Sequence, residues 1–170
     1  GALLPHAGYV FSGPTAGKVI GSIRVPRRII LLNPSHRYDY PPCALWTGDA
    51  WQTPLGEVPI DRDMTAALEA LDLVTADEKA HLPEHSAEVV VPFLQHVQPD
   101  LQMAFLCITR SCQYDRLNQL GLGLARIVKQ QDDPVLIVTS SDMSHEGGPR
   151  AKETVREHDP IAIEDMKQLN

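Results

Sequence analysis

Three histidines of the sequence each follow a short apolar segment of the kind that forms a buried strand. The segments are residues 2–4, 28–32 and 135–138, and the histidines are His6, His36 and His145. Ligands of open α/β sheets bind at the carboxyl ends of the strands. Because neutral imidazoles bind Fe, Zn, Cu or Ni, this placement indicates a metal site with positions left open for a substrate.

Other interpretations of these residues stay open. A single histidine after a strand is more often a hydrogen-bonded loop residue than a ligand. Asp142 and His145 also fit a turn that begins a helix. A Ser-His-Asp hydrolase built from Ser140 or Ser141 with these two residues is disfavoured, because the sequence has no Gly-x-Ser-x-Gly elbow.

A second polar cluster lies at residues 81–88. If a helix begins near residue 84, His85 and Glu88 share one of its faces and could line a pocket. A structural hydrogen bond between these two side chains is an equal alternative. Pro83 excludes a zincin-like helical pair of His81 and His85, because proline interrupts the helix that would have to hold both.

The elements that must position these residues alternate between apolar runs and amphipathic stretches, which indicates an α/β fold. We expect three layers, with a mainly parallel sheet between helices. The predicted strands are residues 2–4, 28–32, 101–108 and 135–138, and the predicted helices are residues 14–23, 63–71 and 114–131. The turn at residues 53–56, flanked by 43–46 and 58–60, predicts a small antiparallel pair.

The composition argues against several classes of protein. The 170 residues, about one domain in length, include 15 Lys and Arg against 22 Asp and Glu, and only 5% are aromatic. The scattered basic residues argue against nucleic-acid binding, and no apolar run approaches the roughly 18 residues of a membrane-spanning helix. Three cysteines without a Cys-x-x-Cys pair predict a reducing cytoplasm. We expect further segments at both ends, because the chain starts inside an apolar run and stops within a helical pattern.

Five motifs resemble, in this order, those of the Memo-like family, named after a mediator of cell motility. They are Pro5-His6-Ala7-Gly8-Tyr9, Pro34-Ser35-His36, Trp51-Gln52-Thr53-Pro54-Leu55-Gly56, Glu84-His85-Ser86 and Ser140-Ser141-Asp142-Met143-Ser144-His145. The resemblance extends from Leu4 to about Ile163, so we expect residues 1–170 to form a single Memo-like domain. The family's fold is similar to that of class III extradiol dioxygenases, non-haem iron enzymes that open catechol-type rings. The resemblance therefore implies a dioxygenase-related fold.

The resemblance also implies roles for individual residues. His6 and His36 would be two metal ligands, with Fe(II) as the expected ion and Cu or Zn as alternatives. His145 would be the acid/base residue, and Asp142 would orient it or contact the substrate. The residues expected to line the same pocket are Tyr9, Arg37, His85 and Glu88.

In Memo-like proteins a cysteine from a downstream segment completes the ligand set, and we expect that segment beyond Asn170. The expected function is that of a metal-dependent, dioxygenase-like oxidoreductase acting on a small molecule. The alternative is a non-catalytic module that binds a phosphopeptide or a small anion in the same pocket. Arg37 is the only basic residue next to the histidine motifs, which favours the enzyme, because phosphate sites usually use several. Bacterial and archaeal members often accompany a radical S-adenosylmethionine protein, which makes such a protein an expected partner.

Overall fold

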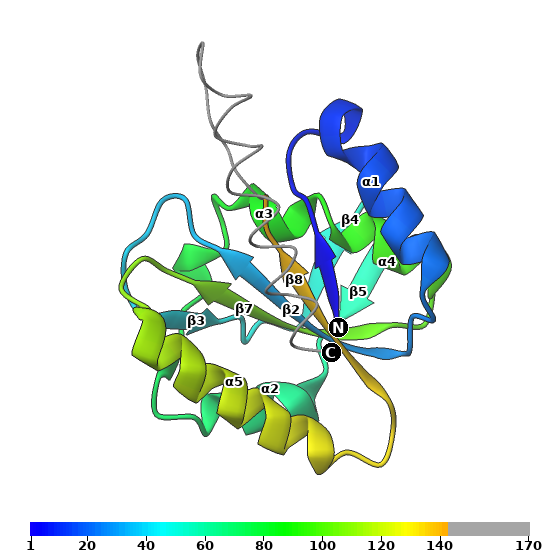
Figure 1. Ribbon diagram of the computed structural model, residues 1–170. Coiled ribbons are helices and arrows are strands. Elements are labelled where there is room, and N and C mark those ends of the chain that lie inside the picture. The colour runs from blue at the N-terminus through cyan, green and yellow to red at the C-terminus, as the bar shows by residue number, and fades with distance from the viewer. Residues whose placement is uncertain (143–170) are drawn as a thin grey trace.

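The computed structural model describes residues 1–142, which form a six-stranded sheet between two layers of helices (Figure 1). The strands, in the order in which they lie side by side, are β1 (Ala2–Leu4), β8 (Val135–Ser140), β2 (Arg28–Pro34), β7 (Gln102–Ile108), β3 (Cys43–Leu45) and β6 (Val74–Ala76). The first four are parallel, whereas β3 is antiparallel to β7 and β6 is parallel to β3. The predicted α/β fold with a mainly parallel sheet is confirmed.

The helices cover both faces of the sheet and form the two outer layers (Figure 1). The helices on one face are α1 (Tyr9–Ser22), α3 (His85–Glu88) and α4 (Val91–Val97), and those on the other are α2 (Arg62–Glu69) and α5 (Tyr114–Lys129). A short 3-10 helix, η1, spans Glu78–Ala80. Along β2, Ile29 and Leu31 pack into the core cluster that contains α1 and α4, and Ile30 packs into the cluster that contains α2 and α5. This alternation is the period of two that a strand buried on both faces requires.

Helix α1 begins at Tyr9 rather than at residue 14, so the predicted start of this helix is wrong. The prediction placed Pro14 in the first turn, where proline costs least. In the structure Pro14 lies inside the helix, where it cannot donate to the carbonyl of Val10. Val10 is 87% exposed, so water can satisfy that carbonyl.

The antiparallel pair around the turn is formed by β4 (Ala50–Thr53) and β5 (Gly56–Pro59). The predicted segment 58–60 overlaps β5, whereas the predicted segment 43–46 is wrong. Residues 43–45 instead form β3 and extend the main sheet beside β7. Both Thr75 and Ala76 of the edge strand β6 are exposed. Within the described part of the chain, no helix is long and apolar enough to cross a membrane.

Candidate metal centre

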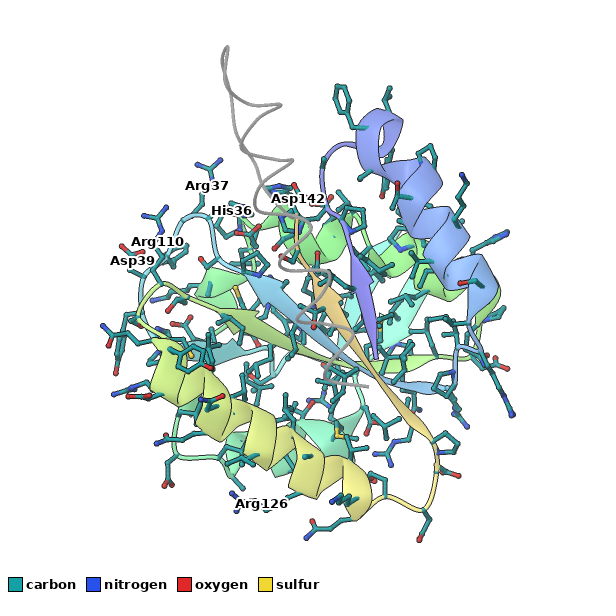
Figure 2. All side chains as sticks on the ribbon, in the orientation of Figure 1. His36, Arg37, Asp39, Arg110, Arg126 and Asp142 are labelled. Carbon is teal, nitrogen blue, oxygen red and sulfur yellow. The ribbon has the colours of Figure 1, made fainter. Side chains whose placement is uncertain are left out.

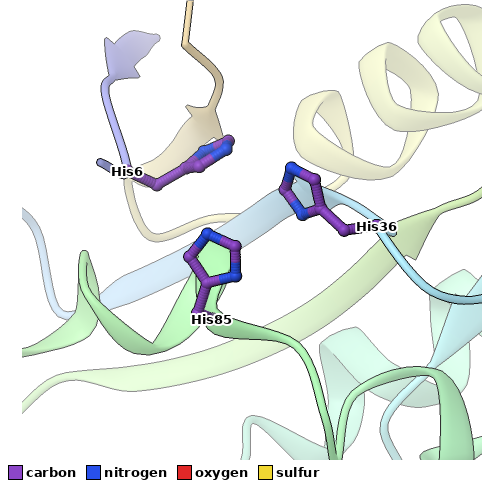
Figure 3. A group of neighbouring side chains, drawn as sticks. All are labelled: His6, His36 and His85. Atoms are coloured by element: carbon purple, nitrogen blue, oxygen red, sulfur yellow. The ribbon is translucent and has the colours of Figure 1, made fainter. Parts of the chain in front are cut away.

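Three histidine rings converge at the carboxyl edge of the parallel strands (Figure 3). His6 follows β1, His36 follows β2, and His85 is the first residue of α3. Each ring offers one nitrogen, and these three atoms lie within 4.8 Å of one another. The ring centroid of His6 lies 5.4 Å from that of His36 and 5.6 Å from that of His85. His6 is buried while the other two are exposed, so the group is accessible from one side.

The pairing of β1 with β8 positions His6. Leu4 pairs with Ser140, and two residues further along each strand the backbone N–H of His6 donates to Asp142 Oδ1 over 2.8 Å. The other carboxylate oxygen of Asp142 lies 4.0 Å from His6 Nε2. Asp142 and His36 therefore project from the same edge of the sheet (Figure 2). The register thus brings a carboxylate next to the His6 imidazole.

Hydrogen bonds determine which nitrogen of His6 carries the proton. The Ser140 hydroxyl donates to the Ser86 carbonyl over 2.5 Å, which uses its only hydrogen. Ser140 Oγ must then accept from His6 Nδ1, 2.9 Å away, so Nε2 carries the lone pair. Burial lowers the pKa of His6 and outweighs the opposing charge of Asp142. His6 is therefore a neutral imidazole at neutral pH, which is the form that binds metal.

One buried carboxylate, that of Glu84, holds the other two rings. Glu84 Oε1 accepts from His36 Nδ1 over 2.9 Å and lies 3.4 Å from His85 Nδ1. Its second oxygen accepts from the backbone N–H of His36 over 2.7 Å. Carboxylates commonly orient metal-binding histidines in this way, by fixing the Nδ1 proton and leaving Nε2 free. Glu84 thus orients His36 by hydrogen bonds and lies next to the ring of His85.

The environment of Glu84 keeps its carboxylate charged. Burial alone would raise the pKa of this carboxyl group, but hydrogen bonds from His36 and Ser86 lower it to about 2. The side chain of Glu84 is only 1% exposed, so this charge is strongly coupled to its donors. The side chain of Glu84 also caps α3, because it accepts from the Ser86 N–H over 3.0 Å.

The donor set fits a divalent transition metal. Three imidazoles and a carboxylate are ligands that suit Fe, Zn or Cu. Two nitrogens at about 2.1 Å from one ion are at most about 4.2 Å apart, so the 4.8 Å spread must close slightly on binding. The exposed rings of His36 and His85 have the freedom to make that adjustment.

The structure also describes Tyr9, Arg37 and Glu88, which the sequence predicted to line the pocket. Tyr9 is 51% exposed in the first turn of α1, with its ring edge-on to Phe93. Burial and the charge of Glu88 raise the pKa of the Tyr9 hydroxyl, which places that carboxylate near the tyrosine. The exposed side chain of Arg37 extends outward from the loop after β2 (Figure 2). His145 lies outside the described residues.

Two alternatives raised by the sequence receive no support from this geometry. His85 faces Glu84 rather than Glu88, so the structural pair expected within residues 85–88 is replaced by a contact with the preceding residue. Ser140 is fully buried with its hydroxyl committed to Ser86, and the Ser141 hydroxyl donates to the backbone carbonyl of Asp142. Neither serine is arranged as the nucleophile of a hydrolase.

Sequence reasoning did not identify Glu84 and Ser140 as the partners that orient the histidines. Glu84 immediately precedes the short helix that carries His85, where a carboxylate commonly caps the helix. Ser140 is the last residue of its strand and resembles any small buried residue.

The chain is similar to several known proteins. A family model described as "Memo-like protein" matches residues 1–170. A MEMO1 family protein of Aquifex aeolicus is 38% identical over 169 residues, which are 99% of this chain and 61% of that protein. A MEMO1 family protein of Sulfurisphaera tokodaii is 36% identical over 174 residues, with 99% of this chain and 60% of the relative covered. The chain thus spans about three fifths of the length of these relatives.

A similar fold occurs in the crystal structure of the uncharacterized protein JW3007 from Escherichia coli K12. The TM-score is 0.56 with 16% sequence identity, and the match covers 85% of this chain and 61% of that one. This likeness concerns the fold alone. The family model, by contrast, covers every residue from the first histidine motif to the end, and on that evidence the chain belongs to the Memo-like protein family.

Proposed function

We propose that this chain carries a divalent metal on His6, His36 and His85, with Asp142 beside the site, and that it belongs to a metal-dependent oxidoreductase. The observation that carries the proposal is the convergence of three ring nitrogens within 4.8 Å. Protein oxygens form hydrogen bonds with Nδ1 of His6 and His36, and Glu84 Oε1 lies 3.4 Å from Nδ1 of His85. This arrangement leaves the Nε2 atoms for a metal. Fe(II) is the proposed ion, with Zn and Cu as alternatives, because imidazole and carboxylate suit all three.

The residues of this chain would share the work of the site. A metal bound here supplies Lewis-acid or redox chemistry and leaves positions open for a substrate. Glu84 keeps His36 and His85 oriented, and the Asp142 carboxylate, 4.0 Å from His6 Nε2, is placed to bind the ion or to accept a substrate proton. We assign the movement of the proton to His145 on the family resemblance. The substrate is proposed to be a small molecule.

Metal titration of the chain under anaerobic conditions tests the assignment. We expect one Fe(II) or Zn(II) per chain, and no stoichiometric binding by the double variant His6→Ala/His36→Ala. The single variant His85→Ala should bind more weakly, because it loses one of three imidazoles. His96→Ala is the matched control, since His96 is exposed on α4, and it should bind like the parent chain. One metal per chain retained in the double variant would remove these residues from the ligand set.

The same titration should depend on pH. Protons compete with the metal for imidazole lone pairs, and ordinary imidazoles become protonated below about pH 6.5. We therefore expect metal affinity to decrease as the pH falls from 7.5 to 5.5. Burial lowers the pKa of His6, so protons should compete with the metal for this ligand less than for an ordinary imidazole. Affinity that stays constant over this range would indicate that carboxylates provide most of the binding.

A further inference from the structure

Two of the three cysteines lie in contact in the core on the α5 side of the sheet. Cys43 Sγ lies 3.7 Å from Cys112 Sγ, although the two residues are 69 positions apart in the sequence. Both cysteines are free thiols in this structure. A disulfide holds its two sulfurs about 2.0 Å apart, so this pair has to close by about 1.7 Å to form one.

The sheet and the turn after β7 bring the pair together. Cys43 begins β3 and pairs with Ile108 of β7 on one side and with Val74 of β6 on the other. Cys112 lies in the turn between β7 and α5, where its N–H donates to the Thr109 carbonyl over 3.0 Å. Because Cys43 is held on both sides and Cys112 is outside the strand pairs, we expect Cys112 to make most of the closing movement.

The third cysteine, Cys107, is separated from the pair by the sheet. Cys107 pairs with Ala44, the neighbour of Cys43, and successive residues of a strand point to opposite faces. Cys107 packs with Ala44 and Ala80, whereas Cys43 and Cys112 belong to the core cluster that contains α2 and α5. The fold therefore brings Cys112 to Cys43 and keeps Cys107 apart from both.

The two paired thiols differ in their access to solvent. Cys43 is fully buried, and this burial together with the neighbouring Cys112 raises the pKa of its thiol, against the opposing charge of Arg116. Cys112 is 7% exposed and directly precedes Gln113, the N-cap of α5. Reactive cysteines are often found at helix N-termini and beside arginines. Cys112 is therefore the thiol that an oxidant reaches first.

We propose that Cys43 and Cys112 form a reversible disulfide when the chain meets hydrogen peroxide. The Cys112 thiolate attacks one peroxide oxygen, the O–O bond breaks, and the hydroxide that leaves is protonated to water, so Cys112 becomes a sulfenic acid. The Cys43 sulfur then attacks the sulfur of this sulfenic acid, the S–O bond breaks, and the leaving hydroxide takes the Cys43 proton. Each cysteine sulfur loses one electron and the peroxide gains two, so the products are one disulfide and two waters.

Trypsin separates the three cysteines, because it cleaves after lysine and arginine. Cys43 lies in the peptide 38–62, Cys107 in the peptide 80–110 and Cys112 in the peptide 111–116. The metal-free chain in EDTA is treated with hydrogen peroxide at a dose that fully oxidises dithiothreitol, and the remaining thiols are blocked with N-ethylmaleimide. By mass spectrometry we expect 38–62 to be linked to 111–116, with Cys107 blocked. The number of free thiols should fall from three to one, and a reductant should restore all three.

Unfolding provides the matched comparison for this experiment. In concentrated urea the shortest loop closes most easily, so peroxide should favour a bridge between Cys107 and Cys112 instead. In the folded state, Cys107→Ala should form the same bridge as the parent chain, whereas Cys112→Ala should keep its two remaining thiols free.

Three free thiols in the folded chain after peroxide would overturn the proposal. A bridge that includes Cys107 in the folded chain, or one that joins two chains, would overturn it as well. Because no metal is present, failure here leaves the histidine site untouched, and failure of the metal titration leaves the cysteine pair untouched.

Discussion

Glu84→Gln should weaken metal binding about 10- to 100-fold, the usual cost of losing an outer partner of metal-binding histidines. Glutamine nearly keeps the shape of the side chain but replaces one oxygen by an NH2 group. Glu84 oxygens accept from His36 Nδ1, the His36 N–H and the Ser86 N–H. The NH2 group of the glutamine side chain cannot accept, so at least one of these donors would lose its acceptor. Isothermal titration with Zn(II) measures the effect. Glu88→Gln is the control, because this carboxylate is exposed on the same short helix and, among the described residues, forms no hydrogen bond or ion pair with the three histidines.

The same variant should change the response of stability to acid. The pKa of Glu84 is about 2 in the folded chain against an ordinary value of 4.5, so its stabilisation is complete above about pH 4.5 and is lost as the pH falls toward 2. A difference of this size corresponds to about 3 kcal/mol of the free energy of unfolding. Urea unfolding at pH 6 and pH 3 should show that Glu84→Gln is less stable at pH 6 and that the difference narrows at pH 3. A constant difference between the two pH values would mean that the charge of Glu84 contributes nothing.

The sequence predicted the main strands because their burial requires uninterrupted apolar runs. Residues 28–32 and 101–108 are of this kind, and both lie at the centre of the sheet. The sequence also predicted that His6 and His36 lie at one edge of the sheet, because parallel strands have their carboxyl ends on the same side. The short strands β3 and β6 were not recognised as part of this sheet, because three-residue segments carry little periodicity.

Orientation within the site could not be predicted, because it depends on contacts between distant segments. His85 was placed in the pocket by its motif, but its membership in the histidine group requires α3 to pack beside the end of β2. Glu84 and His36 are 48 residues apart, and Ser140 and His6 are 134 residues apart. Periodicity describes one element at a time and contains no information about such pairs.

The contact between Arg28 and Asp61 is another pair of this kind, and its removal should cost the fold about 3–5 kcal/mol. Arg28 Nε lies 2.6 Å from Asp61 Oδ2, and Nη2 lies 2.9 Å from Oδ1, so the two side chains form a bidentate pair. Asp61 is 4% exposed and also caps α2 by accepting from the Met64 N–H. Arg28→Met would keep most of the side-chain volume but leave this buried carboxylate without its cation. Urea unfolding at pH 7 measures the loss.

A second ion pair provides the control for Arg28→Met. Arg62 and Asp49 form a pair whose side chains are 54% and 98% exposed, so Arg62→Met should cost less than about 1 kcal/mol. The double variant Arg28→Met/Asp61→Ser should recover part of the loss, because serine can still cap α2 but carries no charge that needs a partner. Metal affinity should remain unchanged in Arg28→Met, because Arg28 begins β2 whereas His36 follows its other end, about 20 Å away along seven residues of strand. Equal losses in Arg28→Met and Arg62→Met would show that burial of the Asp61 charge does not determine the cost.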